Sequence, residues 1–460
     1  MRSGPKSEST ATGGGADSGF AGSSALLELI FLCFLLVSQL YYGFRWVLHY
    51  GSAGTSPTYS DTPPMFEAGK YGLALALFIL SAIIVLANRG RTRRIDRDAL
   101  ILLILTGGFA TYCFALGVTF LQGTATEGAY RVIRGYFFFP LLALVPFHFR
   151  GWSSLRKYFA IVVIFGCAYH IGYSAIQILA FELFGRLPSL AFPGGLVRFG
   201  GGWDDPNGFG GFVVLPLLFL ISDAFLLSKR KRVLIGAVLA PLLVLTVSVA
   251  AAASMVGALV CYVALRRKWW LLIGLAAVVA LPLLSSTVRD LLMFAYQAKE
   301  ASVESHFVSM SLGDFFSQSS MIEVLFGRHG ANASISESYY VALAEDFGCV
   351  GAIWFLTIIG LTLVNALRKA RALGLANDHK GAETFRVLAS FIAGLSFASV
   401  GIAYYLVFPV NLYLWLAIFA VWLTRGGATS LECVGAPAYP LDGREPAMVT
   451  INDATCVPVR

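Results

Sequence analysis

Charge is scarce in this chain. Charged residues make up only 13% of its 460 residues, whereas 57% are hydrophobic. A soluble globule of this size needs more polar surface, so the composition excludes one and predicts a protein that crosses a membrane several times. The seven cysteines are scattered singly, with no CxxC pair and no metal-ligand spacing. We therefore expect no disulfide framework, no metal centre and no cofactor.

The signatures of several enzyme classes are also missing. No HExxH, GxSxG or P-loop pattern occurs, which argues against a metalloprotease, an α/β-hydrolase and a P-loop ATPase. The net charge is +8, but the basic residues form short clusters between apolar runs. The lipid bilayer is therefore the expected partner, and nucleic acid is not. The first 24 residues are polar and rich in Gly and Ser, so we expect no cleavable signal peptide.

Apolar runs predict an all-α polytopic integral membrane protein with about 12 transmembrane helices. We expect disordered cytoplasmic tails at residues 1–24 and 425–460, and a single transmembrane domain at 25–424. The weakest pair of spans, 233–249 and 255–265, is joined only by AAAAS. Because the second is short, we expect a hairpin with a partly re-entrant arm. The other predicted spans are 25–47, 71–87, 99–118, 135–149, 158–181, 209–227, 269–284, 339–364, 387–407 and 412–423.

Lysine and arginine concentrate in the loops on one side of these spans, the last of them at 368–386. The positive-inside rule predicts that these loops and both termini are cytoplasmic. Two large loops, 182–208 and 285–337, then lie on the outer side. The second is long enough to carry amphipathic helices that lie on the membrane or cap a cavity.

A glycine-dense turn in the first outer loop carries Arg198, Asp205 and Asn207 at the start of an apolar helix. Its glycines permit positive φ and close approach to a ligand, and Pro206 keeps Asp205 out of helical geometry. Asp205 or Asn207 fits the N-cap, where free N–H groups attract an anion. The alternative is a tight turn that only caps the helix. The glycines are Gly194, Gly195, Gly200, Gly201, Gly202, Gly208, Gly210 and Gly211.

Five arginines fall on the outer side, where basic residues are scarce: Arg131, Arg134, Arg198, Arg289 and Arg328. Arginine binds phosphate oxygens bidentately, and several arginines in one cavity suit a diphosphate leaving group. Arg131 and Arg134 share one helix face, where a lipid phosphate or ordinary headgroup anchoring fits equally well. The alternative is that each arginine is interfacial or ion-paired.

A second polar stretch, Ser336 to Leu356, leads from the long loop into an apolar helix. Glu337 is a candidate base or acceptor-orienting group, and Tyr339 and Tyr340 offer ring faces for sugars. The alternative is a serine N-cap, at Ser336 or Ser338, followed by interfacial tyrosines. By contrast, His170 lies in the middle of an apolar span and is expected to be a packed, hydrogen-bonded core residue.

Together these stretches resemble the O-antigen polymerase and O-antigen ligase superfamily of bacterial envelope glycosyltransferases. The first stretch supplies an outer Arg before a Gly-rich, Pro-Asn turn. The second follows a long loop with a polar triplet, nine residues and Gly-x-x-Gly. The likeness covers roughly residues 190–365. The matching positions are Arg198, Gly202, Pro206, Asn207, Ser336 to Ser338, Gly348 and Gly351.

Two departures from the family pattern favour a polymerase over a ligase. Ligases typically have His-Asn where this chain has Ser336-Glu337. The family's frequent Ser-Arg-Gly appears here as Ser254-Met255-Val256-Gly257, without its Arg. A ligase stays open because His306 or His329 could substitute. A transporter or flippase is a third possibility, although its ionisable residues would lie near the midplane and its halves would be related.

The resemblance implies an inner-membrane enzyme that joins O-antigen or exopolysaccharide repeat units on undecaprenyl diphosphate, on the periplasmic side and without a metal. By this likeness Arg198 and Arg289 would bind the diphosphate, helped by Arg131, Arg134 and Arg328. Glu337 or Asp205 would orient or deprotonate the acceptor hydroxyl, and Asn207, Tyr339 and Tyr340 would bind substrate. A chain-length regulator and a flippase are the candidate protein partners.

Overall fold

The computed structural model describes residues 29–40, 97–120, 152–184, 198–203, 205–224, 227–267, 312–328, 338–402, 404–405 and 410–424, with isolated positions at 69–83, 136 and 269–297. These residues form helices and turns, and none of them is in a strand. The predicted all-α class is thus confirmed for this part of the chain. Both predicted tails lie outside the described residues.

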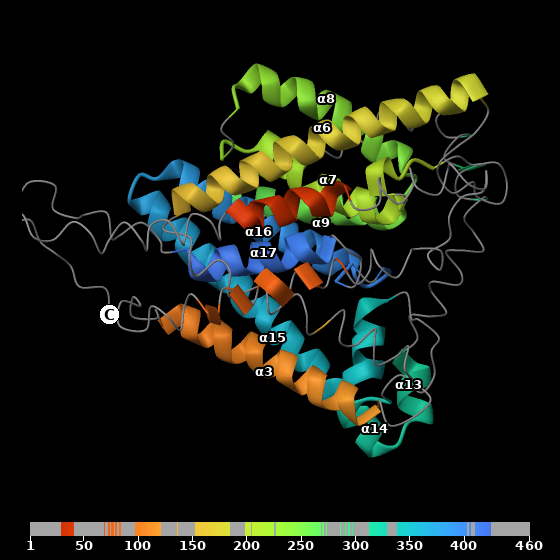
Figure 1. Cartoon of the computed structure of the whole chain (residues 1–460), viewed down its shortest axis with the longest axis vertical. Coiled ribbons are helices and arrows are strands. Elements are labelled where there is room, and N and C mark those ends of the chain that lie inside the picture. The colour runs from red at the N-terminus through yellow and green to blue at the C-terminus, as the bar shows by residue number, and fades with distance from the viewer. Residues whose placement is uncertain are drawn as a thin grey trace, which may run out of the picture.

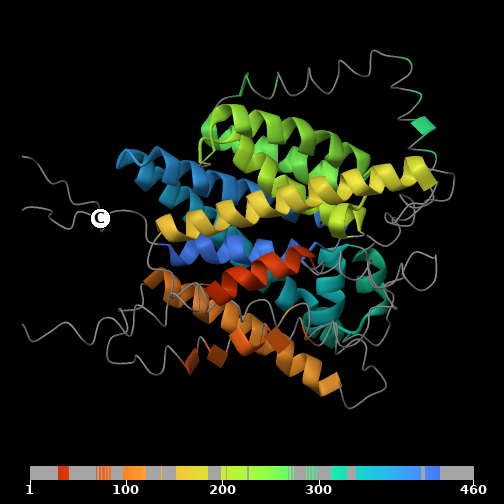
Figure 2. The same cartoon turned by 45° about the horizontal axis from the view of Figure 1, so that its top comes forward.

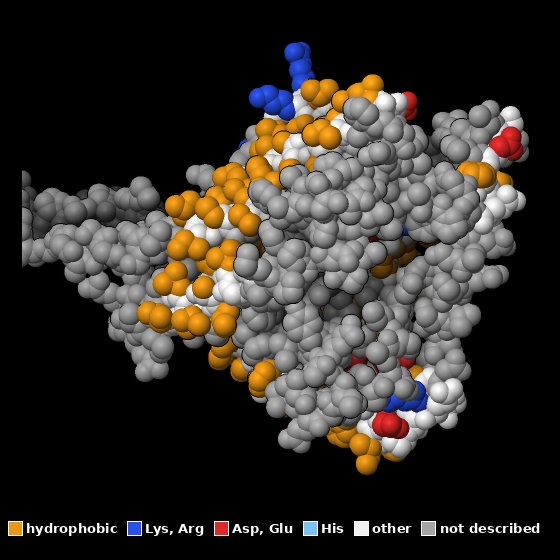
Figure 3. All heavy atoms as spheres, turned by 45° about the vertical axis from the view of Figure 1, so that its right-hand side comes forward, with side chains coloured by type: hydrophobic (Ala, Val, Ile, Leu, Met, Phe, Trp, Pro, Cys, Tyr) orange, Lys and Arg blue, Asp and Glu red, His pale blue; other side chains and the backbone are white. Residues whose placement is uncertain are grey.

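Four helices are long and apolar enough to cross a membrane: α3 (Arg97–Phe120), α6 (Trp152–Phe184), α9 (Val249–Arg266) and α15 (Tyr339–Leu375). Many large apolar side chains stay exposed on the helices, among them Val244 at 74% and Ile353 at 65%. Apolar side chains gather over one side of the surface in Figure 3. Such a surface suits lipid, so the chain is a membrane protein. The number of about 12 spans stays a prediction.

Helices α16 (His379–Ala398) and α17 (Val410–Leu423) lie in the middle of the bundle (Figures 1 and 2). On one side α16 packs against α9 and α7 (Pro206–Ile221), and on the other both helices pack against α15. The contact of α16 with α9 is close because the residues are small: a Cβ on Gly394 would collide with the backbone of Ser254 and the side chain of Ala258.

Two predicted helix boundaries are wrong. The AAAAS segment belongs to α9 itself. The connection from α8 (Lys229–Leu245) is the turn at 246–248, where the Ser248 hydroxyl caps α9 by accepting from Ala251 N–H at 3.1 Å. With 18 residues, α9 is not the short re-entrant arm we expected. The basic segment 368–386 is likewise helical except near Asp378, whose side chain caps α16 by accepting from Gly381 N–H at 2.9 Å.

The segment 285–337 carries two short helices, α13 (Leu312–Gln318) and α14 (Met321–Phe326). They lie beside a break in α15, where Gly348 has φ 64°. A Cβ at Gly348 would collide with the backbone of Leu325 and Phe326, so only glycine allows α14 to pack here. The Tyr112 hydroxyl donates to the Phe347 carbonyl at 2.8 Å, which satisfies an acceptor beside the break.

The bundle has two ends of different chemistry. One end, which we call the Arg198 pole, contains the N-termini of α7, α9 and α15; the opposite end, the basic pole, contains their C-termini. Among described residues near the Arg198 pole, the basic side chains are Arg198 and Arg328. Those of the basic pole include Lys229, Arg230, Lys231, Arg232, Arg266, Arg267, Arg368, Lys369, Arg371, Lys380 and Arg386.

Candidate functional site

Arg198 lies at the centre of the Arg198 pole and ties three segments together. Its Nε donates to the Thr246 carbonyl at 2.8 Å, and its Nη2 donates to Asn207 Oδ1, also at 2.8 Å. The Ser248 hydroxyl donates to the same Asn207 oxygen at 2.7 Å. The arginine is only 4% exposed. These two acceptors are neutral and hold the guanidinium in place, and Asp205 is a nearby group of opposite charge.

Asp205 caps the N-terminus of α7, as one of the two sequence alternatives proposed. It has extended backbone geometry, and its Oδ1 accepts from Asn207 N–H at 2.9 Å. Burial raises the pKa of Asp205 from its ordinary value, while the backbone N–H groups of Asn207 and Gly208 and the charge of Arg198 oppose that shift. Burial also lowers the pKa of Arg198, and Asp205 opposes that shift.

The glycines of this turn contact protein side chains. A Cβ on Gly211 would lie 2.6 Å from the ring of Tyr404, so the absence of a side chain lets this tyrosine reach α7. Of the turn's described glycines, only Gly201 has positive φ, at 56°. Close packing within the protein therefore explains part of the glycine density that we assigned to a ligand.

Tyr404 and Tyr405, in the connection between α16 and α17, join the two polar stretches. Tyr404 packs against Gly211 of α7, in the glycine-dense stretch that carries Arg198. Tyr405 stacks on Tyr339 with 4.7 Å between ring centroids, at the start of α15. The backbone N–H of Tyr339 also donates to the Ser399 carbonyl at 3.0 Å, at the end of α16. Sequence reasoning missed this tyrosine pair because neither residue belongs to a motif.

The first turn of α15 buries one of its predicted sugar-binding tyrosines. Tyr339 is 1% exposed, with its ring against Tyr136, Phe355 and Tyr405. Tyr340 is partly exposed, and its hydroxyl donates to the Ser396 carbonyl at 2.8 Å. Tyr339 therefore has a structural role in this state, and Tyr340 has the more accessible ring. Ser338 occupies the N-cap position, without a side-chain capping bond.

His170 is a packed, hydrogen-bonded core residue, as the sequence predicted. Its Nδ1 accepts from the backbone N–H of Gly202 at 3.1 Å. Since that amide can only donate, the ring hydrogen lies on Nε2, which donates to Gln39 Oε1 at 3.0 Å. The Gln39 amide in turn donates to the hydroxyl of Tyr413. The histidine thus fixes the Arg198 turn onto α6, and both of its ring nitrogens are occupied.

Beyond His170, the same face of α6 carries polar groups that lack partners. Ser174 and Gln177 lie four and seven residues further along the helix, and both are fully buried. The Ser174 hydroxyl and both amide atoms of Gln177 have no hydrogen-bond partner within the described structure. The indole Nε1 of Trp203, whose ring contacts His170, is buried and equally unpartnered. Buried polar atoms are normally satisfied, so these unpartnered groups are exceptions within the described core.

Several predicted site residues lie elsewhere. Arg328 belongs with α13 and the break in α15: its guanidinium lies 5.4 Å from the ring of Phe315, and its backbone N–H donates to Glu345 at 2.7 Å. No described contact joins Arg328 to Arg198. Six other candidate residues lie outside the described residues: Arg131, Arg134, Arg289, Glu337, His306 and His329.

No group of three or more His, Cys, Asp or Glu side chains among the described residues could hold a metal ion. No family model and no curated protein matches the chain. The interpretation therefore rests on the geometry described above.

Proposed function

We propose that the protein is a membrane glycosyltransferase that polymerises saccharide repeat units carried on undecaprenyl diphosphate, with its reaction centre at the Arg198 pole. One observation carries the proposal. The two stretches on which the family resemblance rests are far apart in the sequence, yet Tyr404 and Tyr405 connect them at one end of the bundle. A reaction that brings two lipid-linked substrates together needs such a shared site.

The chemistry of this pole suits a diphosphate leaving group. In the proposed reaction an acceptor hydroxyl attacks the anomeric carbon of the donor, the bond from that carbon to the diphosphate oxygen breaks, and undecaprenyl diphosphate leaves. Negative charge grows on the departing oxygen. The positive charge of Arg198, beside the N-terminus of α7, would stabilise that oxygen.

Asp205 is the described candidate for the acceptor's base. Its raised pKa makes the carboxylate a stronger base than an ordinary surface aspartate. Glu337 and the arginines Arg131, Arg134 and Arg289 remain part of the proposal on sequence grounds alone.

The polar face of α6 supports a saccharide substrate. An amide that can donate and accept, a hydroxyl and an indole N–H suit a ligand rich in hydroxyl groups, and leaving each unpaired costs about 1–3 kcal/mol. Gln177, Ser174 and Trp203 are at most 1% exposed, so their assignment as saccharide-binding residues requires this face to open when the substrate binds. A neutral polar face of this kind discriminates among sugars without adding charge.

A direct test uses the purified full-length protein in lipid nanodiscs with a lipid-linked oligosaccharide repeat. The proposal predicts a ladder of lengthened glycans, read on a gel, and released undecaprenyl diphosphate, read by mass spectrometry. A single transfer to added lipid A core, without a ladder, would replace the polymerase with a ligase. Movement of intact substrate across the membrane without bond formation would replace it with a transporter.

A further inference from the structure

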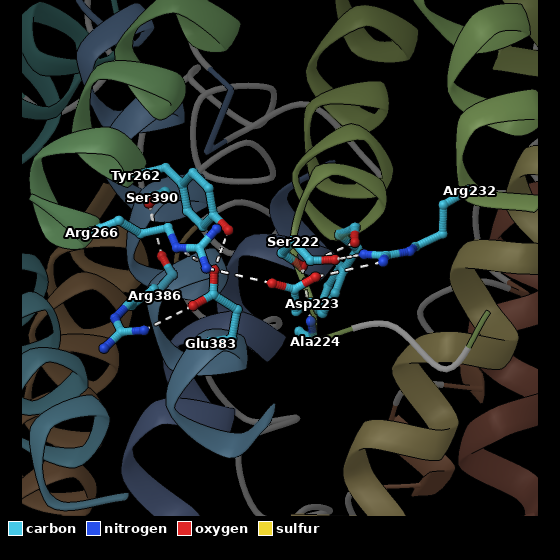
Figure 4. A network of polar contacts seen from close by, with 10 residues as sticks. Ser222, Asp223, Ala224, Arg232, Tyr262, Arg266, Glu383, Arg386 and Ser390 are labelled. Atoms are coloured by element: carbon cyan, nitrogen blue, oxygen red, sulfur yellow. Dashed lines mark hydrogen bonds and ion pairs between the residues drawn. The ribbon is translucent and has the colours of Figure 1, made fainter. Parts of the chain in front are cut away.

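A buried carboxylate organises the basic pole. Glu383 on α16 accepts from Arg386 Nη1 at 2.8 Å, and its other oxygen pairs with Arg266 Nε at 3.3 Å and accepts from the Tyr262 hydroxyl. The Glu383 side chain is only 3% exposed, whereas Asp223, which pairs with Arg266 at 3.4 Å, is 70% exposed. Figure 4 shows the two carboxylates facing the same arginine. Glu383 thus fixes two guanidinium groups from different helices.

A pocket of 530 Å³ lies beside this network, between the ends of α9, α15 and α16. Its lining consists of four arginines and four apolar residues: Arg266, Arg267, Arg371, Arg386, Ala264, Leu265, Leu367 and Ala370. Two carboxylates contact this lining set: Glu383 is shared by Arg266 and Arg386, and Asp223 also pairs with Arg266. The pocket therefore keeps a clear excess of positive charge.

Two of these arginines have no ion pair with any described residue. Arg267 and Arg371 are both exposed, and the described ion pairs at this pole involve Arg232, Arg266 and Arg386 instead. Arg267 also occupies the C-cap of α9 with φ 53°, a left-handed conformation that favours Gly or Asn. Its backbone N–H donates to the Ala264 carbonyl at 3.1 Å, so this conformation ends the helix and places the side chain at the pocket.

Lys369 is a basic residue near this pocket whose charge, unlike that of Arg267 and Arg371, already has partners among the described residues. Lys369 donates to the carbonyls of Val421, Trp422 and Thr424 at 2.8, 3.0 and 2.6 Å. Its charge is used inside the protein to close the end of α17, where carbonyls have no helical partner. Not every cation of this pole therefore needs a ligand, and the argument rests on the arginines of the pocket alone.

We propose that this pocket binds the phosphate of an anionic phospholipid. Guanidinium groups bind phosphate bidentately, which accounts for a lining of arginines. Beside them Ala264, Leu265, Leu367 and Ala370 continue along apolar helices, where α9 and α15 expose Val260 and Val364. This arrangement provides for a charged headgroup with acyl chains alongside. Basic pockets between membrane helices bind anionic headgroups in this way. The site lies at the opposite pole from the proposed reaction centre and does not depend on it.

The test compares two double variants of the full-length protein that lose the same charge. Arg267→Gln/Arg371→Gln changes the pocket. Arg230→Gln/Lys231→Gln changes exposed residues of the same pole that do not line it. Native mass spectrometry measures the binding of phosphatidylglycerol against phosphatidylcholine. At about a fivefold effect per basic residue, the pocket variant should bind phosphatidylglycerol about 30-fold more weakly, and the control should bind like the wild type.

Three outcomes would overturn the proposal. Wild-type protein that shows no preference for phosphatidylglycerol would remove the site. Equal weakening in the two double variants would indicate general attraction to a basic surface. Soluble glycerophosphate that displaces the lipid at equal concentration would assign the pocket to a water-soluble phosphate ester instead. Size-exclusion profiles establish that both variants are folded.

Discussion

Replacing Lys369 with methionine should destabilise the end of α17. Methionine keeps the apolar stem but removes the ammonium group, which donates to three carbonyls over 2.6–3.0 Å. A hydrogen bond from a charged donor contributes about 1.5–3 kcal/mol. Because Lys369 is only partly buried and the three bonds share one ammonium group, we expect a loss of about 2–4 kcal/mol in the free energy of unfolding.

The assay is thermal unfolding in detergent, followed by tryptophan fluorescence. Arg368→Met is the matched control, since Arg368 is the exposed neighbour on the same helix and loses the same charge. The Tm of Lys369→Met should be at least about 4 °C below that of the control. Lys369→Arg should fall between them, because a planar fork cannot direct three donors from a single atom. Equal Tm values for Lys369→Met and Arg368→Met would refute the capping role.

Two further changes test the break in α15 and the cap of α7. Gly348→Ala should destabilise the protein by more than about 2 kcal/mol, since φ 64° is unfavourable for alanine and its Cβ would collide with the backbone of Leu325. Gly360→Ala, at an open position of the same helix, should be neutral or stabilising, and thermal unfolding of both variants measures the difference. For Asp205, the polymerisation rate should rise with pH through a pKa above 3.8, because a base acts only when deprotonated. Asp205→Asn should remove this dependence.

Separate outcomes would contradict the predictions for Gly348 and for Asp205. Equal stability of Gly348→Ala and Gly360→Ala would mean that α14 does not pack tightly against the break. A pH profile that is unchanged in Asp205→Asn would leave Asp205 as a helix cap only and would move the role of base to Glu337.

Hydropathy predicted the helices well and their polar ends poorly. The apolar runs correspond to α3, α6, α7 and α17 because burial in lipid or in the core requires apolar length. The segment 368–386 was predicted as a loop because it is rich in charge. Some of its charges have tertiary partners, as in the contacts of Lys369 with α17 and of Glu383 with two arginines. Such partners cannot be seen in a local average of hydropathy.

The candidate site was predicted in part. The sequence indicated the turn with Arg198, Asp205 and Asn207, because a Gly-rich Pro-Asn turn before an apolar helix is unusual. It gave no sign of Tyr404 and Tyr405, whose role depends on the long-range packing of α7, α15 and α16.

The polar face of α6 was missed although the sequence contains a signal for it. His170, Ser174 and Gln177 are spaced four and three residues apart within an apolar span, which places them on one helix face. His170 was interpreted by itself, so its two polar neighbours on this helix face, Ser174 and Gln177, were not identified.

The most direct measurement is the glycan product of Arg198→Ala in nanodiscs with a lipid-linked repeat, alongside Arg198→Lys and the exposed control Arg230→Ala. Size-exclusion and thermal unfolding of each variant separate a folding defect from a catalytic one. We predict that folded Arg198→Ala forms no polymer, that Arg198→Lys forms shortened chains, and that Arg230→Ala matches the wild type. Polymer of normal length from Arg198→Ala would contradict the assignment of the reaction centre to the Arg198 pole.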